Sequence, residues 1–130
     1  MTTSALAFII AAPTPLRYSL RALLTRLPQI DEVREVDDVR SFLLALPLAD
    51  PRLIVLDATA LHHESDQVLP EIKSAVPEAR LVVLVDHIEQ QQAVKAAIAD
   101  RVLLKGYPAA DLFASLEQLL TQSEQSDDQR

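Results

Sequence analysis

Two residues of opposite charge, Asp57 and Lys105, each come directly after a short run of apolar residues. The run before Asp57 reads Leu-Ile-Val-Leu, and the run before Lys105 reads Val-Leu-Leu. A carboxylate or an ammonium group is costly in a half-buried crevice unless it is paired, so we expect the two side chains to face each other. Such a pair is either a structural ion pair or part of a functional site, and the spacing alone favours neither interpretation.

Composition excludes several other kinds of chemistry. The 130 residues include no cysteine, which excludes disulfides, thiolate catalysis and thiolate metal sites. They include one glycine, Gly106, so the chain can contain neither a G-x-G-x-x-G motif nor a P-loop. Dinucleotide-binding dehydrogenases and P-loop nucleotidases are therefore excluded. His62 and His63 lie near two acidic residues, but adjacent histidines rarely bind one ion, and we interpret this stretch as a solvated loop without a metal.

Charge and hydropathy limit the partners that this chain can have. The formal net charge is −7 and there is no basic block, so we expect no direct contact with nucleic acid. The apolar run at residues 5–12 is too short to span a bilayer and lacks the flanking features of a signal peptide. We therefore expect a cytoplasmic protein without membrane contact.

Short apolar segments alternate with helical patterns five times. The predicted strands are residues 6–10, 33–36, 53–56, 81–85 and 102–104. Most of them are continuously apolar, which is typical of parallel strands buried on both faces. Five such units predict an α/β fold, a flavodoxin-like doubly wound parallel sheet with strand order 2-1-3-4-5 and the charged second strand at an edge. Residues 1–122 are expected to form this one domain, and the polar residues 123–130 a tail or linker.

Capping residues predict where the helices begin. Thr14 is expected at the N-cap of the first helix, and Asp37 or Asp38 at that of the second. Pro70 fits the third helix only in its first turn, because proline lacks the N–H that a helix interior needs. A fourth helix is predicted over residues 90–99, with a thin apolar stripe.

In a sheet of this order, functional residues gather at the carboxyl ends of the strands, near the switch between the first and third strands. The residues that this rule brings to one edge are Ala11, Ala12, Asp57, Val85, Asp86 and Lys105. We interpret Asp86 as the N-cap of the fourth helix, because Asp86 and Glu89 have the spacing of a capping box.

Three segments of the chain resemble the receiver domains of two-component response regulators. They are LIVLD at residues 53–57, LLK at residues 103–105 and PLRYSLRALL at residues 15–24. The resemblance extends over residues 6–120 and implies the CheY-like form of the fold described above. The third segment is most similar to the first helix of receivers that precede a helix-turn-helix DNA-binding domain.

The resemblance implies a role for each strand end. In that family, the aspartate that ends the third strand accepts a phosphoryl group from a histidine kinase, and an acidic pair that ends the first strand binds Mg²⁺. A hydroxyl residue ends the fourth strand and a lysine ends the fifth. An aromatic residue on the fifth strand changes rotamer upon phosphorylation. The resemblance thus assigns the phosphoacceptor-equivalent position to Asp57 and the lysine position to Lys105.

The remaining positions depart from the family pattern. Ala11 and Ala12 stand in place of the acidic pair, Val85 in place of the hydroxyl residue and Val102 in place of the aromatic residue. Mg²⁺ needs oxygen ligands, so we expect its binding to be weak or absent, and we expect no other cofactor. Phosphoryl transfer depends mainly on the charge neutralisation that the ion supplies. The resemblance therefore implies a degenerate receiver, or pseudo-receiver.

We favour a non-enzymatic module that binds a protein partner or a second copy of itself and signals without phosphorylation. An attached DNA-binding domain would make it the regulatory part of a transcription regulator. By the resemblance, its contact surface is either the face of the fourth helix, fifth strand and fifth helix, or the first helix. The expected exposed side of the first helix carries Arg17, Tyr18, Arg21 and Arg26.

Two alternatives remain open. One is an active phosphoacceptor, modified on Asp57 by a histidine kinase, with Asp86 completing an atypical metal site. The other is a small-molecule sensor whose less polar crevice is lined by Ala11, Ala12 and Val85.

Overall fold

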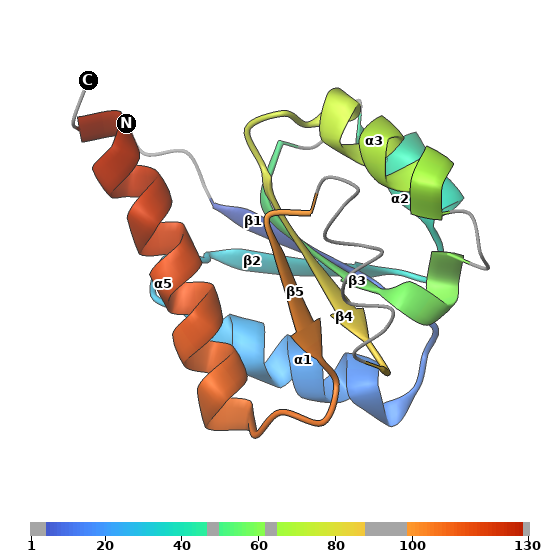
Figure 1. Ribbon diagram of the computed structural model, residues 1–130, viewed down its shortest axis with the longest axis horizontal. Helices are drawn as coiled ribbons and strands as arrows, with labels where there is room; N and C mark the ends of the chain where they lie inside the picture. Colours follow the sequence, from blue (N-terminus) through green and yellow to red (C-terminus); the bar gives the residue numbers. More distant parts are fainter. Residues whose placement is uncertain (1–4, 47–49, 62–64, 88–98, 129–130) are drawn as a thin grey trace.

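The computed structural model describes residues 5–46, 50–61, 65–87 and 99–128, with the backbone alone for residues 65–67 and 122–128 (Figure 1). Its five strands are β1 (Leu6–Ile10), β2 (Glu32–Val36), β3 (Pro51–Asp57), β4 (Arg80–Val85) and β5 (Arg101–Leu104). All neighbouring strands are parallel, and their order is β2-β1-β3-β4-β5. The predicted α/β fold, the strand order and the edge position of the charged second strand are confirmed.

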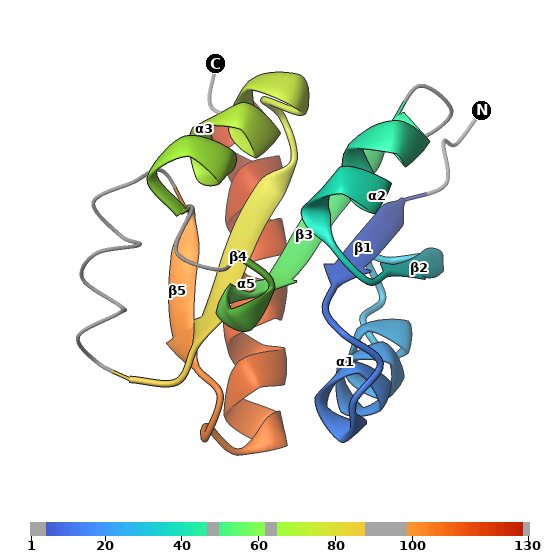
Figure 2. The same cartoon turned by 90° about the vertical axis from the view of Figure 1, so that its right-hand side faces the viewer.

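Helices cover both faces of the sheet. They are α1 (Pro15–Thr25), α2 (Val39–Ala45), the 3₁₀ helix η2 (Ala58–Leu61), α3 (Ser65–Ala75) and α5 (Ala109–Asp128). Figure 2 shows α1 and α5 on one face of the sheet, with α2 and α3 on the other. This arrangement gives the central strands an apolar layer on each side.

The side chains of β3 alternate between two apolar cores. Leu53 and Val55 pack in the core under α1 and α5, whereas Ile54 and Leu56 pack in the core under α2 and α3. In the second core, the ring of Phe42 from α2 meets that of Phe8 from β1 edge to face, with centroids 5.0 Å apart and an interplanar angle of 84°. Two covered faces explain why the central strands are continuously apolar rather than alternating.

Two helices begin at the predicted cap positions, but only one side chain makes the capping bond. Asp38 caps α2, and its carboxylate accepts a hydrogen bond of 2.7 Å from the backbone N–H of Ser41. Thr14 occupies the N-cap of α1, where its side chain makes no capping bond. Pro15 follows at the first helical position, where proline's missing N–H forgoes no intrahelical bond.

The position of Pro70 differs from the prediction. α3 begins at Ser65, so Pro70 lies in the helix interior rather than in its first turn. Its ring nitrogen cannot donate to the carbonyl of residue 66, which weakens the helix locally. Leu69 and Ile72, both fully buried, hold this turn of α3 against the sheet and allow the helix to continue through the proline.

The C-terminal helix is longer than the hydropathy pattern indicates. α5 extends to Asp128, so residues 123–128 are helical where the sequence predicted an aperiodic tail. The apolar stripe of α5 ends at Leu120, and a polar stretch gives no periodic signal even though its residues can propagate a helix already begun. His62, His63 and nearly all of the predicted fourth helix at residues 90–99 lie outside the described residues.

Candidate functional site

The carboxyl ends of β1, β3 and β4 bring the predicted positions to one edge of the sheet. Ile10 lies level with Leu56 of β3, so Ala11 follows at the level of Asp57 on the neighbouring strand. Asp57 is the last residue of β3 and lies level with Leu84 of β4. The edge therefore has the register that the fold class predicts.

Asp57 is the buried charged residue at this edge, with 6% of its surface exposed. Its Oδ1 atom lies 2.6 Å from Nζ of Lys105, which confirms the predicted pairing. The same oxygen accepts a hydrogen bond of 3.0 Å from the backbone N–H of Thr59. Because η2 begins directly after β3, the chain turns back and brings the N–H of Thr59 to the carboxylate of Asp57. Aspartate side chains in turns commonly accept a hydrogen bond from the backbone two residues further along the chain.

Lys105 contacts two carboxylates rather than one. Its Nζ lies 3.2 Å from Oδ1 of Asp86 in addition to its shorter contact with Asp57. Burial disfavours the ammonium form, but the hydrogen bonds and charges of Asp57 and Asp86 outweigh it and raise the pKa of Lys105 above its usual 10.5. The backbone N–H of Lys105 donates to the carbonyl of Val85 at 2.9 Å, which fixes the lysine beside the end of β4.

The contact of Asp86 with Lys105 was not predicted from the sequence, where Asp86 was interpreted as a helix N-cap. The helix that it would cap lies outside the described residues, so that interpretation stays a prediction. The ion pair nevertheless shows that Asp86 belongs to the same charged cluster as Asp57. The sequence feature that predicts this location is the position of Asp86 directly after the apolar strand β4.

The other strand ends supply apolar surface. Ala11 is fully buried in the core under α1 and α5, whereas Ala12 is exposed. Val85 is fully buried and Val102 nearly so, both in the core under α2 and α3. None of these four side chains carries an oxygen that could bind a cation or a hydroxyl that could bind a phosphoryl group.

A Mg²⁺ ion does not fit this donor set. An octahedral Mg²⁺ site needs convergent oxygen ligands, and the end of β1 offers only alanine side chains. The ammonium group of Lys105 instead contacts both carboxylates, Asp57 and Asp86, of the edge. Within the described residues, no group of three or more histidine and acidic side chains could hold a metal ion.

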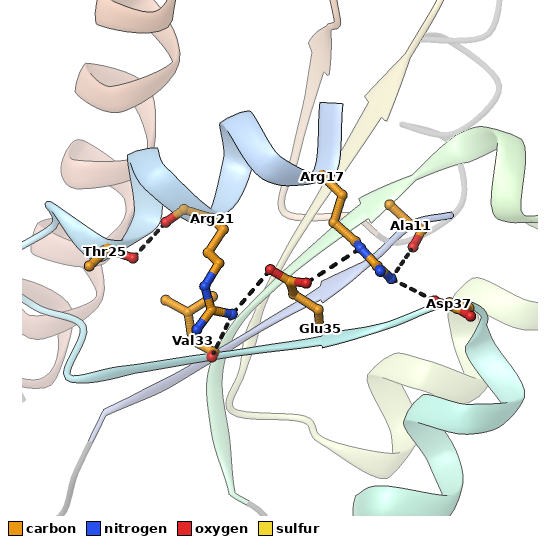
Figure 3. A network of polar contacts seen from close by, with 7 residues as sticks. All are labelled: Ala11, Arg17, Arg21, Thr25, Val33, Glu35 and Asp37. Atoms are coloured by element: carbon orange, nitrogen blue, oxygen red, sulfur yellow. Dashed lines mark hydrogen bonds and ion pairs between the residues drawn. The ribbon is translucent and has the colours of Figure 1, made fainter. Parts of the chain in front are cut away.

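A second charged cluster, which sequence reasoning missed, joins α1 to the end of β2 (Figure 3). Arg17 and Arg21, one turn apart on α1, reach down to Glu35 and Asp37, which lie at the end of β2 and just after it. Arg17 does not lie on the exposed side of α1 as its sequence position predicts, because only 14% of its side chain is exposed. Periodicity assigns a residue to a helix face, but it does not reveal how far a long arginine side chain reaches around that face.

The wider α1 surface is less basic than its sequence indicates. Two of its arginines are paired with β2 or with the residue that follows it, so much of their charge is neutralised within the domain. Tyr18, 66% exposed, and Arg26 remain on the outer side of α1. In the part of the chain that the structure describes, no helix is long and apolar enough to cross a membrane.

No protein-family model and no curated protein sequence matches this chain. Solved structures do match it. A CheY-like response regulator receiver domain protein from Methanospirillum hungatei JF-1 is 17% identical, with a TM-score of 0.80, over 95% of this chain and 99% of that one. A LuxR family DNA-binding response regulator from Silicibacter pomeroyi is 19% identical, with a TM-score of 0.76, over 91% and 93%.

The response regulator RcsB of Salmonella typhimurium is 18% identical, with a TM-score of 0.78, over 93% of this chain. This chain spans only 62% of the length of that RcsB chain. At such identities the likeness establishes the fold: the chain has the fold of response regulator receiver domains. Two of these similar proteins, RcsB and the LuxR family regulator, interact with DNA.

Proposed function

We propose that this chain is an atypical receiver domain of a two-component response regulator that acts as a protein-interaction module without phosphorylation. The observation that carries the proposal is the pair of alanines, Ala11 and Ala12, that follows β1 beside Asp57, where the ammonium of Lys105 contacts the carboxylates of Asp57 and Asp86. The ammonium of Lys105 offsets one of the two negative charges of these carboxylates, and so reduces their electrostatic attraction for a divalent cation. Without that cation, the charge that develops during phosphoryl transfer lacks its main stabilisation.

The two residues that would transmit phosphorylation from this edge to the rest of the domain are also replaced, by Val85 and Val102. Val85 has no hydroxyl group with which to draw the following loop towards a phosphoryl oxygen. Val102 has no ring, and it is already packed in the apolar core with 5% of its surface exposed. A module of this kind works by presenting one constant surface to its partner, as a binding protein rather than as an enzyme.

The setting of the domain follows from the same proposal. We infer a cytoplasmic protein that contacts a protein partner or a second copy of itself, through α1 or through the face that includes β5 and α5. Regulators such as RcsB and the LuxR family protein pair this fold with DNA binding, which supports a place in transcription regulation, with nucleic acid contacted by another domain. The net charge of −7 supports the absence of direct nucleic-acid contact here.

Intact-mass spectrometry tests the proposal. The chain is incubated with acetyl phosphate, with and without Mg²⁺, beside an Asp57→Asn variant and a receiver that carries the acidic pair. The expected result is a phosphoryl adduct on that receiver and none on this chain or its variant. A Mg²⁺-dependent adduct on this chain that is absent from Asp57→Asn would overturn the proposal and establish the alternative, an active phosphoacceptor that a histidine kinase could serve.

A further inference from the structure

Arg17 joins three elements at the β1 and β2 side of the same edge (Figure 3). Its Nη1 atom donates to the backbone carbonyl of Ala11 at 3.1 Å and to Oδ1 of Asp37 at 2.6 Å. Its Nε atom lies 3.4 Å from Oε2 of Glu35, an ion-pair distance without hydrogen-bond geometry. One guanidinium on α1 therefore holds both the end of β1 and the residue that follows β2.

The backbone around Arg17 completes this connection. The N–H of Ala11 donates to the carbonyl of Val36 at 3.0 Å, and the N–H of Thr14 donates to the carbonyl of Ala12 at 2.8 Å. Because the carbonyl of Ala11 also accepts the hydrogen bond from Arg17, both the N–H and the carbonyl of Ala11 are hydrogen-bonded. These bonds fix the β1–α1 connection to the end of β2.

Arg21 offers a natural comparison on the same helix. It also pairs with Glu35, at 3.1 Å, and its Nη1 lies 3.5 Å from the carbonyl of Val33. Its side chain is 52% exposed, against 14% for Arg17, although Asp37, the carboxylate that Arg17 contacts at 2.6 Å, is itself 65% exposed. Exposed ion pairs contribute little, so the difference between the two arginines rests mainly on the partly buried bond from Arg17 to the carbonyl of Ala11.

We propose that Arg17 is a built-in strap that keeps the β1–α1 and β2–α2 connections in one arrangement without any bound ion. On the other side of the edge, Lys105 does the same for the ends of β3 and β4. The inference deepens the proposed function, on which it rests: a module that does not switch needs both halves of its edge held constantly. Each half has its own internal cation.

Amide hydrogen exchange measured by NMR tests the strap residue by residue. In an Arg17→Met variant, we expect exchange at the N–H groups of Ala11 and Thr14 to rise about tenfold or more, because charge-assisted bonds are lost. In Arg21→Met, the matched control, the rise is expected to stay below about twofold. The N–H of Lys105, which donates to Val85, reports the other half of the edge and is expected to keep its rate.

Three results would overturn the strap. They are no rise in Arg17→Met, equal rises in Arg17→Met and Arg21→Met, or an equal rise at Lys105, which would indicate a general loss of stability. If Arg17→Met does not fold, Arg17→Lys replaces it, because an ammonium does not reproduce the guanidinium bridge from Ala11 to Asp37, and unchanged exchange at Thr14 would then contradict the strap. A phosphoryl adduct on Asp57 would overturn the proposed function but leave this exchange comparison readable, so the two failures are distinguishable.

Discussion

Lys105 and Asp57 are unequal partners at the residue scale. Lys105 keeps Asp86 as a second carboxylate partner when Asp57 is removed, and 19% of its side chain is exposed. Asp57 is more buried and would lose the ammonium that contacts it if Lys105 were removed. Breaking the pair from the lysine side should therefore cost more, because it leaves a buried carboxylate without its cation.

We expect Lys105→Met to lower the free energy of unfolding by about 3 kcal/mol and Asp57→Ala to lower it by less. The double variant should be more stable than the sum of the two losses predicts, because neither charge is then left alone. Urea denaturation of the four proteins at neutral pH measures this coupling. Losses below about 0.5 kcal/mol in both single variants would show instead that the pair behaves like an exposed one.

The raised pKa of Lys105 gives this contribution a pH dependence. Burial lowers the pKa, but Asp57 and Asp86 raise it by more, so the folded-state pKa exceeds the usual 10.5. Such a group stabilises the fold fully below its unfolded-state pKa, and the contribution is lost as the pH rises through the folded-state pKa. The stability advantage of the wild-type chain over Lys105→Met should therefore shrink above pH 10.5.

Denaturation curves recorded across that alkaline range measure the advantage directly. Lys105→Arg is the matched control, because a guanidinium stays charged there and its own advantage over Lys105→Met should persist. An advantage of the wild-type chain that stays constant with rising pH would contradict the paired state of Lys105.

At the scale of elements, α1 and α2 begin at comparable caps that differ in one bond. Asp38 accepts a hydrogen bond from the N–H of Ser41, whereas the side chain of Thr14 accepts none. We expect Asp38→Ala to lower the melting temperature clearly and Thr14→Ala to lower it little. Thermal unfolding of the two variants, followed by circular dichroism, makes the comparison, and equal losses would contradict the capping role of Asp38.

This cap also has a pH signature. The bond from the backbone of Ser41 is the main cause that lowers the pKa of Asp38 below its usual 3.8. The stability that follows is present above pH 3.8 and is lost as the pH falls through the lower folded-state value. The difference in melting temperature between the wild-type chain and Asp38→Ala should therefore disappear in strong acid.

The elements could be predicted from the sequence because their signals are local. Continuous apolar runs mark β1, β3 and β4, and their alternation with helices, together with the preference for right-handed crossovers, favours the observed strand order. The interior position of Pro70 and the polar end of α5 were missed. Local rules place a proline at a helix boundary, but tertiary contacts keep Pro70 inside α3. A polar stretch carries no hydrophobic period, but it can propagate a helix that has already begun, as at the end of α5.

The site was predicted in part for a related reason. Burial energetics alone led to the Asp57–Lys105 pair, since both residues follow apolar strands. The contacts of Asp86 with Lys105 and of Arg17 with Ala11 depend on how far a side chain reaches from a neighbouring element. Sequence spacing does not encode that reach.

At the scale of the whole molecule, two internal cations flank the switch between β1 and β3. Lys105 lies at the ends of β3 and β4, and Arg17 lies at the ends of β1 and β2. The fold is that of receiver domains, and the end of β1 carries two alanines where the resemblance to receivers implies an acidic pair. We propose that Lys105, rather than a metal ion, offsets the negative charge of this edge.

A Mg²⁺ titration followed by NMR tests that claim most directly. The reporters are the backbone N–H of Thr59, which donates to Asp57, and that of Lys105, with a receiver that carries the acidic pair titrated alongside. We predict saturable chemical-shift changes in that receiver. In this chain, we predict only a small linear change in chemical shift as the ionic strength rises. A saturable shift of Thr59 and Lys105 at millimolar Mg²⁺ or below, abolished in Asp57→Asn, would contradict the claim.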